Sequence, residues 1–372
     1  MKKSLFFLAM AAVALASCSN DETTEVNQSL ADANTISFRP LTNGVTRATP
    51  KTEWATNDVL DVFAEYKVAE ADYKKFFQAD FTKVSAGNFT SVAKYYWPAM
   101  SGNKMAFTAF YGAAQSTSTA GSLASAFTPN AAAASQTDIM FARKEVTAVE
   151  APVVLNFRHM LSQIDVKVKN TNASLEFDIT GVRIGYVATS GTFACTASTE
   201  TANANLAQNT WTPATLTGDA EAKANTYKYE VTGLTQNISG TVNDATAIGS
   251  FSTWMLIPQD ITAASAYAAT GAAATTDPQL NGAYVAIKTN IKNALTDDVI
   301  VAEQWCYWPI PSVSWNPGYK YTYVVDLAGG GYHPADQNTN VDLDPVLGTP
   351  IEMSASCTID AWDAADATAV SN

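Results

Sequence analysis

The sequence contains few residues of the kinds that build reactive, metal-binding or nucleic-acid-binding sites. Its 372 residues include 2 histidines, 4 cysteines and 22 lysines and arginines, against 35 aspartates and glutamates, for a net charge of -13. Nucleic acids and anionic lipids reward clustered cations, so neither is expected as a partner. After Cys18 only Cys195, Cys306 and Cys357 remain. At most one disulfide can therefore form among these three, and the spacing leaves its pairing open.

Long apolar runs are also scarce. The run Leu5 to Ala16 follows lysines at positions 2 and 3, and it is shorter than the ~20 residues that span a bilayer. It ends at Cys18 in a pattern that resembles a bacterial lipobox, in which the cysteine becomes the acylated first residue. Ordinary secretory cleavage after Ala16 is the alternative. We predict a lipoprotein signal peptide at 1–17, an outer membrane lipoprotein precursor held by Cys18, and a polar tether from Ser19 to Asn34.

The usual constellations of enzymes are missing. His159 shares a strand face with Leu155 and Phe157, which favours a hydrogen-bonded core histidine over a catalytic one. Asp342 and Asp344 offer oxygen ligands for Ca2+, but the Gly and Glu of a full calcium loop do not accompany them, which favours solvated loop carboxylates. We therefore expect no enzymatic activity, no cofactor and no metal.

Alternating apolar residues dominate the remaining sequence. Val153 to Leu161 alternates most clearly, and little of the chain follows a helical period. About 350 residues follow the leader, enough for two domains. We predict an all-β fold of two tandem antiparallel β-sandwich domains, at 48–150 and 151–372. Further strands are expected at 59–64, 95–98, 104–111, 164–168, 175–186, 227–231, 251–258, 284–288, 301–309, 319–327 and 351–362, with a long loop at 112–137.

The segment 18–47 has a distinct organisation. Thr35 to Arg39 alternates and places Ile36 and Phe38 on one face of a short strand, which Pro40 is expected to end. An Asn-Gly turn follows, and then an exposed linker, Val45 to Pro50, whose one basic residue is Arg47. A trypsin-like protease would find the bond between Arg47 and Ala48 easily.

Several short motifs, in order along the chain, resemble those of the fimbrillin family of Bacteroidales, in particular its Mfa-like branch. The residues that carry the resemblance are Thr46 to Ala48, Trp54 to Ala64, Gln136 to Ala142, Phe157 to Leu161, Trp315 to Tyr321, Asp326 to Tyr332 and Thr358 to Trp362. The resemblance implies two transthyretin-like sandwiches and a pilus subunit of the cell surface. It also implies cleavage after Arg47, release of the first strand with Ile36 and Phe38, and entry of a strand from another subunit into the groove.

Two points stay open at this stage. The chain beyond Trp362 lacks large alternating apolar residues, so either Ile351 to Trp362 is the donated strand or the subunit only accepts one and sits at a tip. The runner-up function is a non-polymerising surface lipoprotein that binds glycan or a host protein through exposed aromatics. A surface hydrolase has the least support, because no acid, base or metal constellation appears at a usable spacing.

Overall fold

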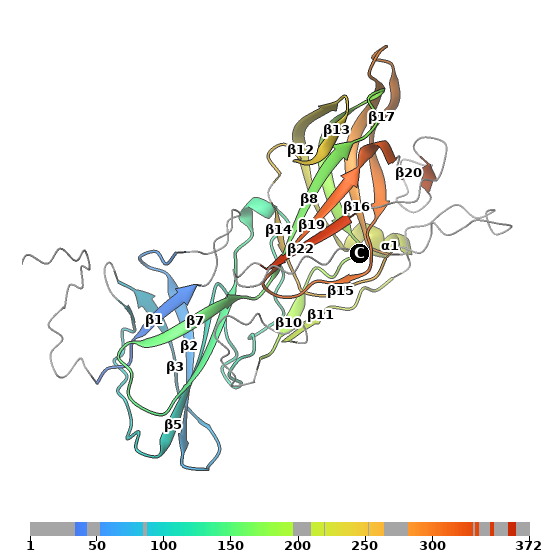
Figure 1. Cartoon of the computed structure of the whole chain (residues 1–372). Coiled ribbons are helices and arrows are strands. Elements are labelled where there is room, and N and C mark those ends of the chain that lie inside the picture. The colour runs from blue at the N-terminus through green and yellow to red at the C-terminus, as the bar shows by residue number, and fades with distance from the viewer. Residues whose placement is uncertain are drawn as a thin grey trace, which may run out of the picture.

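The structure is a computed structural model, and it describes residues 34–42, 53–84, 88–195, 210–218, 220–251, 253–263, 282–329, 332–334, 343–345 and 356–361. Figure 1 shows two bodies of β-structure, one built from the N-terminal strands and one from the remainder. Strands dominate both, and the described helices are α1 (Ala220–Thr226) and the short 3-10 turns η1 (Ala133–Ser135) and η4 (Leu327–Gly329). The prediction of an all-β fold is confirmed.

The N-terminal body is a closed barrel. Its strands follow the order β1-β4-β3-β2-β5-β6-β7 around the barrel, and its core holds many phenylalanines. Because these strands close on themselves, the prediction that this part of the chain forms a β-sandwich is not confirmed. The strands are β1 (Phe38–Thr42), β2 (Val59–Val68), β3 (Lys74–Lys83), β4 (Phe89–Thr90), β5 (Asn103–Tyr111), β6 (Met140–Val146) and β7 (Val153–His159).

The last strand of the barrel lies beyond the boundary expected between residues 150 and 151. β7 pairs with β6 at Met140 and Phe141, and it pairs with β1 along its first five residues. That boundary therefore cuts through the barrel. The chain changes sheets at residues 160–161, immediately before β8 (Ser162–Asn170). The alternating pattern of this region runs almost unbroken through both strands, so it predicts the strands but not their different sheets.

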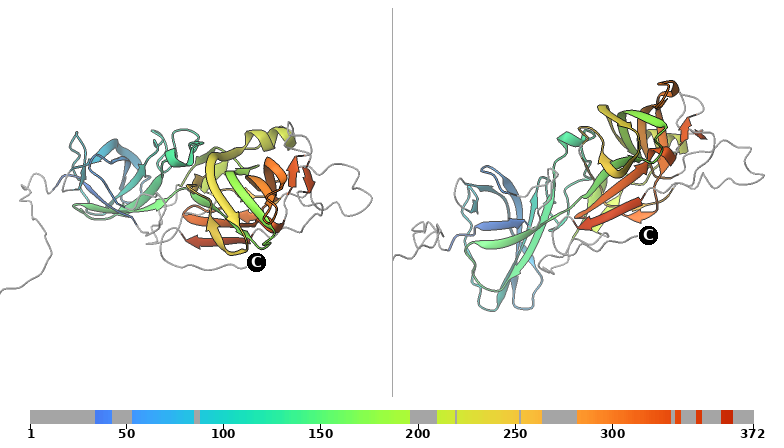
Figure 2. Two further views of the ribbon diagram at one scale, coloured as in Figure 1. Left: turned by 90° about the horizontal axis from the view of Figure 1, so that it is seen from above. Right: turned by 45° about the horizontal axis from the view of Figure 1, so that its top comes forward.

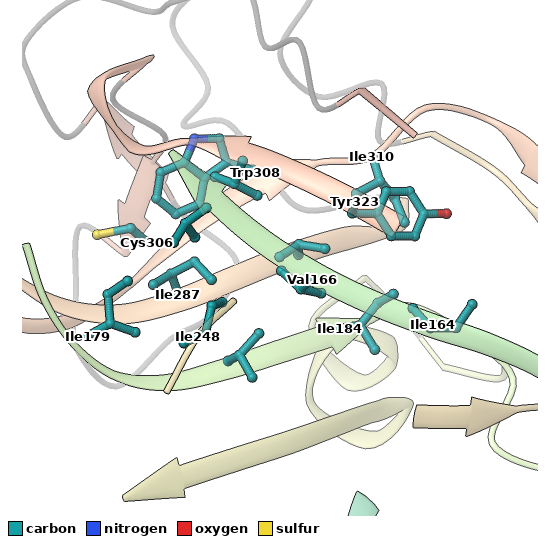
Figure 3. Packing of buried hydrophobic residues seen from close by; sticks show 14 of the residues in the cluster. Ile164, Val166, Ile179, Ile184, Ile248, Ile287, Cys306, Trp308, Ile310 and Tyr323 are labelled. Atoms are coloured by element: carbon teal, nitrogen blue, oxygen red, sulfur yellow. The ribbon is translucent and has the colours of Figure 1, made fainter. Parts of the chain in front are cut away.

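The second body contains two main sheets. One has the order β12-β9-β16-β17-β20-β21, and the other has β13-β8-β19-β22 with β14 also paired to β8. Side chains from both sheets form one core, and Figure 3 shows part of it around Val166, Trp308 and Tyr323. The strands are β9 (Leu175–Gly185), β12 (Lys228–Ser239), β13 (Val242–Ala247), β14 (Trp254–Leu256), β16 (Tyr284–Asn293), β17 (Val299–Pro309), β19 (Tyr319–Asp326), β20 (Tyr332–Pro334), β21 (Leu343–Pro345) and β22 (Ser356–Ala361).

A separate cluster of buried side chains joins the two bodies. Phe110 of β5 and Phe141 of β6 contact Phe193, which itself packs on Trp211. The indole Nε1 of Trp211 donates a hydrogen bond of 2.6 Å to the carbonyl of Met160, at the crossover between the bodies. Two further two-stranded sheets lie outside the main sheets of the second body. They pair β10 (Gly191–Phe193) with β11 (Trp211–Pro213), and β15 (Asp260–Ile261) with β18 (Val313–Ser314).

Most of the other predicted strands are present, with shifted ends. Tyr95–Pro98 was wrongly expected to be a strand, since its pairing is limited to an isolated bridge between Thr35 and Tyr96. β3 and α1 were not expected. The sequence of β3 alternates from Phe77 to Thr82, with Phe77, Ala79 and Phe81 on the core side, so the pattern that identifies a half-buried strand is present there.

Candidate functional site: the first strand of the barrel

The first strand supplies part of the barrel core. Ile36 and Phe38 are 1% and 0% exposed, and the side chain of Pro40 is buried on the same face. Arg39 and Leu41 point outward and are exposed. This alternation follows from the two-residue period of a strand that lines a core.

Phe38 is the central contact between β1 and the barrel. Its ring lies edge-on to the rings of Phe81 and Phe107, with centroid separations of 4.7 and 5.2 Å. Edge-to-face pairs of this kind add to the free energy gained from burial alone. A strand that replaces β1 therefore has to fill a site of aromatic size between β3 and β5.

The hydrogen-bonding of β1 is strongly asymmetric. It pairs in parallel with β7 from Phe38 to Thr42, whereas its pairing with β4 is limited to Phe38 opposite Phe89. The chain just before β1 is held by a hydrogen bond from the Ile36 amide to the Tyr95 carbonyl, over 2.8 Å. Along Arg39 to Thr42, the edge that faces away from β7 has no paired strand among the described residues.

The asymmetry explains why Pro40 does not end the strand, contrary to expectation. The Val153 amide donates to the Ser37 carbonyl over 2.8 Å, so the backbone of Ser37 faces β7. Backbone groups of successive strand residues point to opposite sides, which turns Arg39 toward β7 and Pro40 away from it. The missing N–H of Pro40 therefore faces the edge without a partner strand, where no donor is required.

Trp54 holds the chain on the other side of the expected linker. Its ring packs edge-on against Phe89, Tyr111 and Phe157, and its carbonyl accepts a hydrogen bond from the Lys83 side chain. These contacts fix the start of the remaining chain in the barrel independently of β1.

The expected processing positions, Arg47 and Ala48, and the expected lipidation site, Cys18, lie outside the described residues. The nearest described arginine is Arg39, which is exposed but immediately precedes Pro40 in β1.

His159, Asp342 and Asp344 were the other candidates for catalysis or metal binding. His159 Nδ1 lies 2.8 Å from Asp138 Oδ2, with the two side chains 2% and 4% exposed, so the prediction of a hydrogen-bonded core histidine is confirmed. Asp138 was not recognised as its partner, because 21 residues separate the two. Asp344 lies in β21 and Asp342 lies outside the described residues; in the described ranges, no group of three or more His, Cys, Asp or Glu is placed to hold a metal.

The three cysteines expected in the body are free thiols. Cys306 is buried in β17, and burial raises its pKa to about 12. Burial also raises the pKa of Cys357 in β22, to about 11. A thiol with so high a pKa holds almost no thiolate at neutral pH, so burial makes both residues poor nucleophiles.

A cavity of about 420 Å3 lies in the second body beside β11, lined by residues that include Trp211, Leu216 and Gln259. Its size falls in the range of small-molecule sites. The Gln259 amide, however, is used inside the protein: its oxygen accepts from the Ala188 amide over 2.6 Å, and its nitrogen donates to the carbonyls of Ala188 and Ile257. Gln259 therefore fixes local structure.

The fold and the first strand define an all-β protein whose N-terminal barrel is completed by a short strand from the start of the described chain. The sequence matches the fimbrillin-like family over residues 46–345. The chain belongs to this family. No curated protein sequence matches it. Within the described residues, no helix is long and apolar enough to cross a membrane.

Solved structures also match the chain, at low sequence identity. A fimbrial protein from Bacteroides vulgatus is 12% identical, with a TM-score of 0.53 over 86% of this chain and 99% of that one. A protein assigned to cell adhesion from Bacteroides ovatus is 16% identical, with a TM-score of 0.44 over 89% and 99% of the two chains. A fimbrial assembly protein from Parabacteroides distasonis is 12% identical, with a TM-score of 0.38 over 84% and 98%.

Proposed function

We propose that this protein is a fimbrial subunit of the cell surface that is exported as a lipidated precursor, processed after Arg47 and assembled by β-strand addition to support adhesion. Membership of the fimbrillin-like family supports the fimbrial role. The observation that carries the assembly step is the asymmetric first strand, which fills the barrel core but pairs fully with one neighbour only. In this proposal Cys18 anchors the precursor to the outer membrane, and cleavage detaches the rest of the chain from that anchor.

The energetics favour replacement over an empty groove. Burial of a large apolar side chain is worth about 1.5–3 kcal/mol, and both Phe38 in β1 and Ile36, two residues before it, are fully buried. Loss of β1 exposes their sites and leaves β7 with an unpaired edge. An unpaired edge beside an apolar groove is a template for another strand, since main-chain hydrogen bonds give affinity and side-chain sites give specificity.

Cleavage at Arg47 is the proposed trigger because it turns an intramolecular strand into a separate peptide. While the linker is intact, the strand is held near its groove and returns to it after each opening. After cleavage it dissociates, and a strand from another subunit competes on equal terms. Trp54 keeps the new N-terminal region on the barrel.

The proposal is tested by treating the purified mature protein with an arginine-specific protease and measuring its size in detergent without heating. We expect a ladder of oligomers that heat converts to monomer. Arg47→Ala should abolish both cleavage and ladder. The double variant Arg47→Lys, Lys51→Gln keeps the charge at position 47, resists the arginine-specific enzyme and should regain the ladder when a lysine-specific enzyme cuts after residue 47.

Two outcomes would overturn the proposal. A ladder that persists in Arg47→Ala removes the role of that residue. A cleaved protein that stays monomeric and retains its first strand removes strand exchange, and saturable binding to a glycan array would then favour the non-polymerising surface lipoprotein.

A further inference from the structure

We infer that the loop at residues 112–137 is a strap that locks the barrel to the second body and holds the two in one fixed orientation. Among the described strands, the chain passes from the barrel to the second body once, at residues 160–161. Bodies joined by so short a crossing move relative to each other unless an apolar interface prevents it. Long loops with little regular structure are uncommon in compact proteins and usually have a function.

The first part of the strap is fastened to the barrel by a buried glutamine. Gln115 is 2% exposed. Its backbone amide donates to the Asp61 carboxylate of β2 over 2.9 Å, and its side-chain nitrogen donates to the carbonyls of Asp61 and Thr108, each over 3.3 Å. Its side-chain oxygen accepts a hydrogen bond from the Gly121 amide over 3.0 Å. This one residue therefore joins β2, β5 and the middle of the strap.

The middle of the strap, residues 121–127, pairs with the second body. It runs antiparallel beside β10, which pairs with β11 on its other side. The small sheet of β10 and β11 thus gains a third segment from the loop of the barrel, and backbone hydrogen bonds join the two bodies directly. These bonds run from the Leu123 amide to Phe193, from the Cys195 amide to Gly121, and in both directions between Phe127 and Gly191, over 2.7–3.0 Å.

Apolar side chains fill the space beneath the strap. Phe110 and Phe141 alternate with core residues and so lie on the outer face of the barrel, yet they are 0% and 1% exposed. Phe193 of β10 contacts both rings, and Leu123 and Phe127 of the strap pack against the same cluster. Burial of this apolar surface opposes separation of the two bodies.

The end of the strap and the chain crossing are also held from both sides. Gln136 Oε1 accepts a hydrogen bond from the Met255 amide of β14 over 2.5 Å. At the crossing, the Met160 amide donates to the Ile139 carbonyl of the barrel over 3.0 Å, and the Met160 carbonyl accepts from Trp211 of the second body. The two-residue crossing is therefore not a free pivot.

The strap leaves the barrel and returns to it. The teal loop between β5 and β6 lies where the two bodies meet in Figure 1 and in both views of Figure 2. β5 and β6 are neighbours, and Tyr111 at the end of β5 pairs with Met140 at the start of β6. A short linker can therefore replace the strap without changing the order of the barrel strands.

A distance measurement between two spin labels tests the lock in the uncleaved protein. The labels are attached at Asp80→Cys in β3 and at Thr232→Cys in β12, both exposed positions. The other cysteines that a reagent can reach, at positions 18, 195 and 357, are replaced by serine in every sample. Because no cleavage is involved, the result does not depend on the proposed strand exchange.

Two strap variants and one control are compared with the native strap. In the first variant a Gly-Ser linker replaces residues 113–137. In the second, Leu123→Pro with Phe127→Pro removes two N–H groups that donate to β10. Ser125→Pro is the matched control, since Ser125 is exposed and donates no backbone hydrogen bond among the described residues.

We expect a single narrow distance distribution with the native strap and in the control, and loss of the narrow peak in both strap variants, with strand content by circular dichroism unchanged. If the linker variant does not fold, the proline variant and its control decide the question. A broad distribution with the native strap, or a narrow peak at the native distance in the folded strap variants, would overturn the inference. Loss of the narrow peak in Ser125→Pro would also overturn it, because the loss would then not depend on pairing with β10.

Discussion

The two bodies of this protein complete their cores in different ways. The barrel is closed by β1, a five-residue strand with one full neighbour, and its core is rich in phenylalanine. In the second body the central strand β19 pairs along its length with β8 and β22, and its Tyr321 and Tyr323 are completely buried. The difference teaches that the two cores are closed in different ways: the barrel depends on a short strand that pairs fully with one neighbour, whereas the central strand of the second body has a partner strand on each side.

The largest expected effect separates the two cores by substitution. Phe38→Ala and Trp254→Ala each remove a fully buried ring, and each should lower the free energy of unfolding of the uncleaved protein by about 3–5 kcal/mol. After cleavage and assembly, the Phe38→Ala effect should vanish because another strand fills its site, whereas the Trp254→Ala effect should persist. Urea denaturation before and after assembly measures both. An undiminished Phe38→Ala effect in oligomers would break the comparison.

Alkaline pH should weaken the second body more than the barrel. Burial raises the pKa of Tyr307 and of Tyr321 to about 12, so their neutral forms stabilise the folded state. That stabilisation is complete below the unfolded-state pKa of about 10, and it is lost as pH rises from about 10 to 12, by about 2 kcal/mol for each tyrosine. In the barrel the pKa of Tyr73 is also raised, first by partial burial and then by Glu145. Because Tyr73 is partly exposed, whereas Tyr307 and Tyr321 are fully buried, solvent weakens its effect and a smaller loss is expected there.

Calorimetry at several pH values between 8 and 11 measures the alkaline effect. Trp254→Ala identifies the transition of the second body, and that transition should move to lower temperature first. Equal movement of both transitions would contradict the assignment of the effect to the buried tyrosines.

A smaller effect is expected at a polar cluster on the outer face of the second body. Arg183 is 4% exposed; its Nε donates to Glu230 over 2.7 Å, its Nη1 donates to the Tyr307 hydroxyl over 3.0 Å, and its guanidinium lies 4.0 Å from the centre of the Trp305 ring. Glu230→Ala leaves the guanidinium without its carboxylate and should cost about 1.5 kcal/mol, because Glu230 itself is partly exposed.

Glu303→Ala is the matched control for this cluster. Glu303 pairs with Lys288 over 2.9 Å on the same sheet, but its side chain is 50% exposed. Its removal should leave the urea midpoint unchanged. If both variants lose the same stability, burial of Arg183 is not the reason for the effect.

The smallest perturbation is chemical labelling of the cysteine thiols. Labelling reports on the opening of the second body alone, because the barrel sequence contains no cysteine. With a pKa of about 12, Cys306 should react with iodoacetamide at pH 8 on the order of 1,000-fold more slowly than an ordinary thiol. Peptide mass spectrometry of native and urea-treated protein measures this. Rapid labelling of Cys306 in the native protein would show that the second core opens more readily than proposed.

Local sequence patterns predicted many of the strands. They failed where the structure depends on pairing with strands far away in the sequence. The alternation of Val153 to Leu161 identifies strands, but only pairing with β1 and β6 places β7 in the barrel. Pro40 suggests a strand end, and it is tolerated because the neighbouring edge carries no partner strand there. The burial of Ile36 and Phe38 followed from alternation, whereas the asymmetric pairing of β1 depends on the positions of β4 and β7 and has no signal in its own sequence.

The most direct test of the replaceable first strand is the polypeptide content of oligomers formed after arginine-specific cleavage. Mass spectrometry of the washed oligomers should find chains that begin at Ala48 and should not find the peptide that contains Phe38. Recovery of that peptide at one copy per subunit would show that β1 stays in its barrel, and would contradict the account.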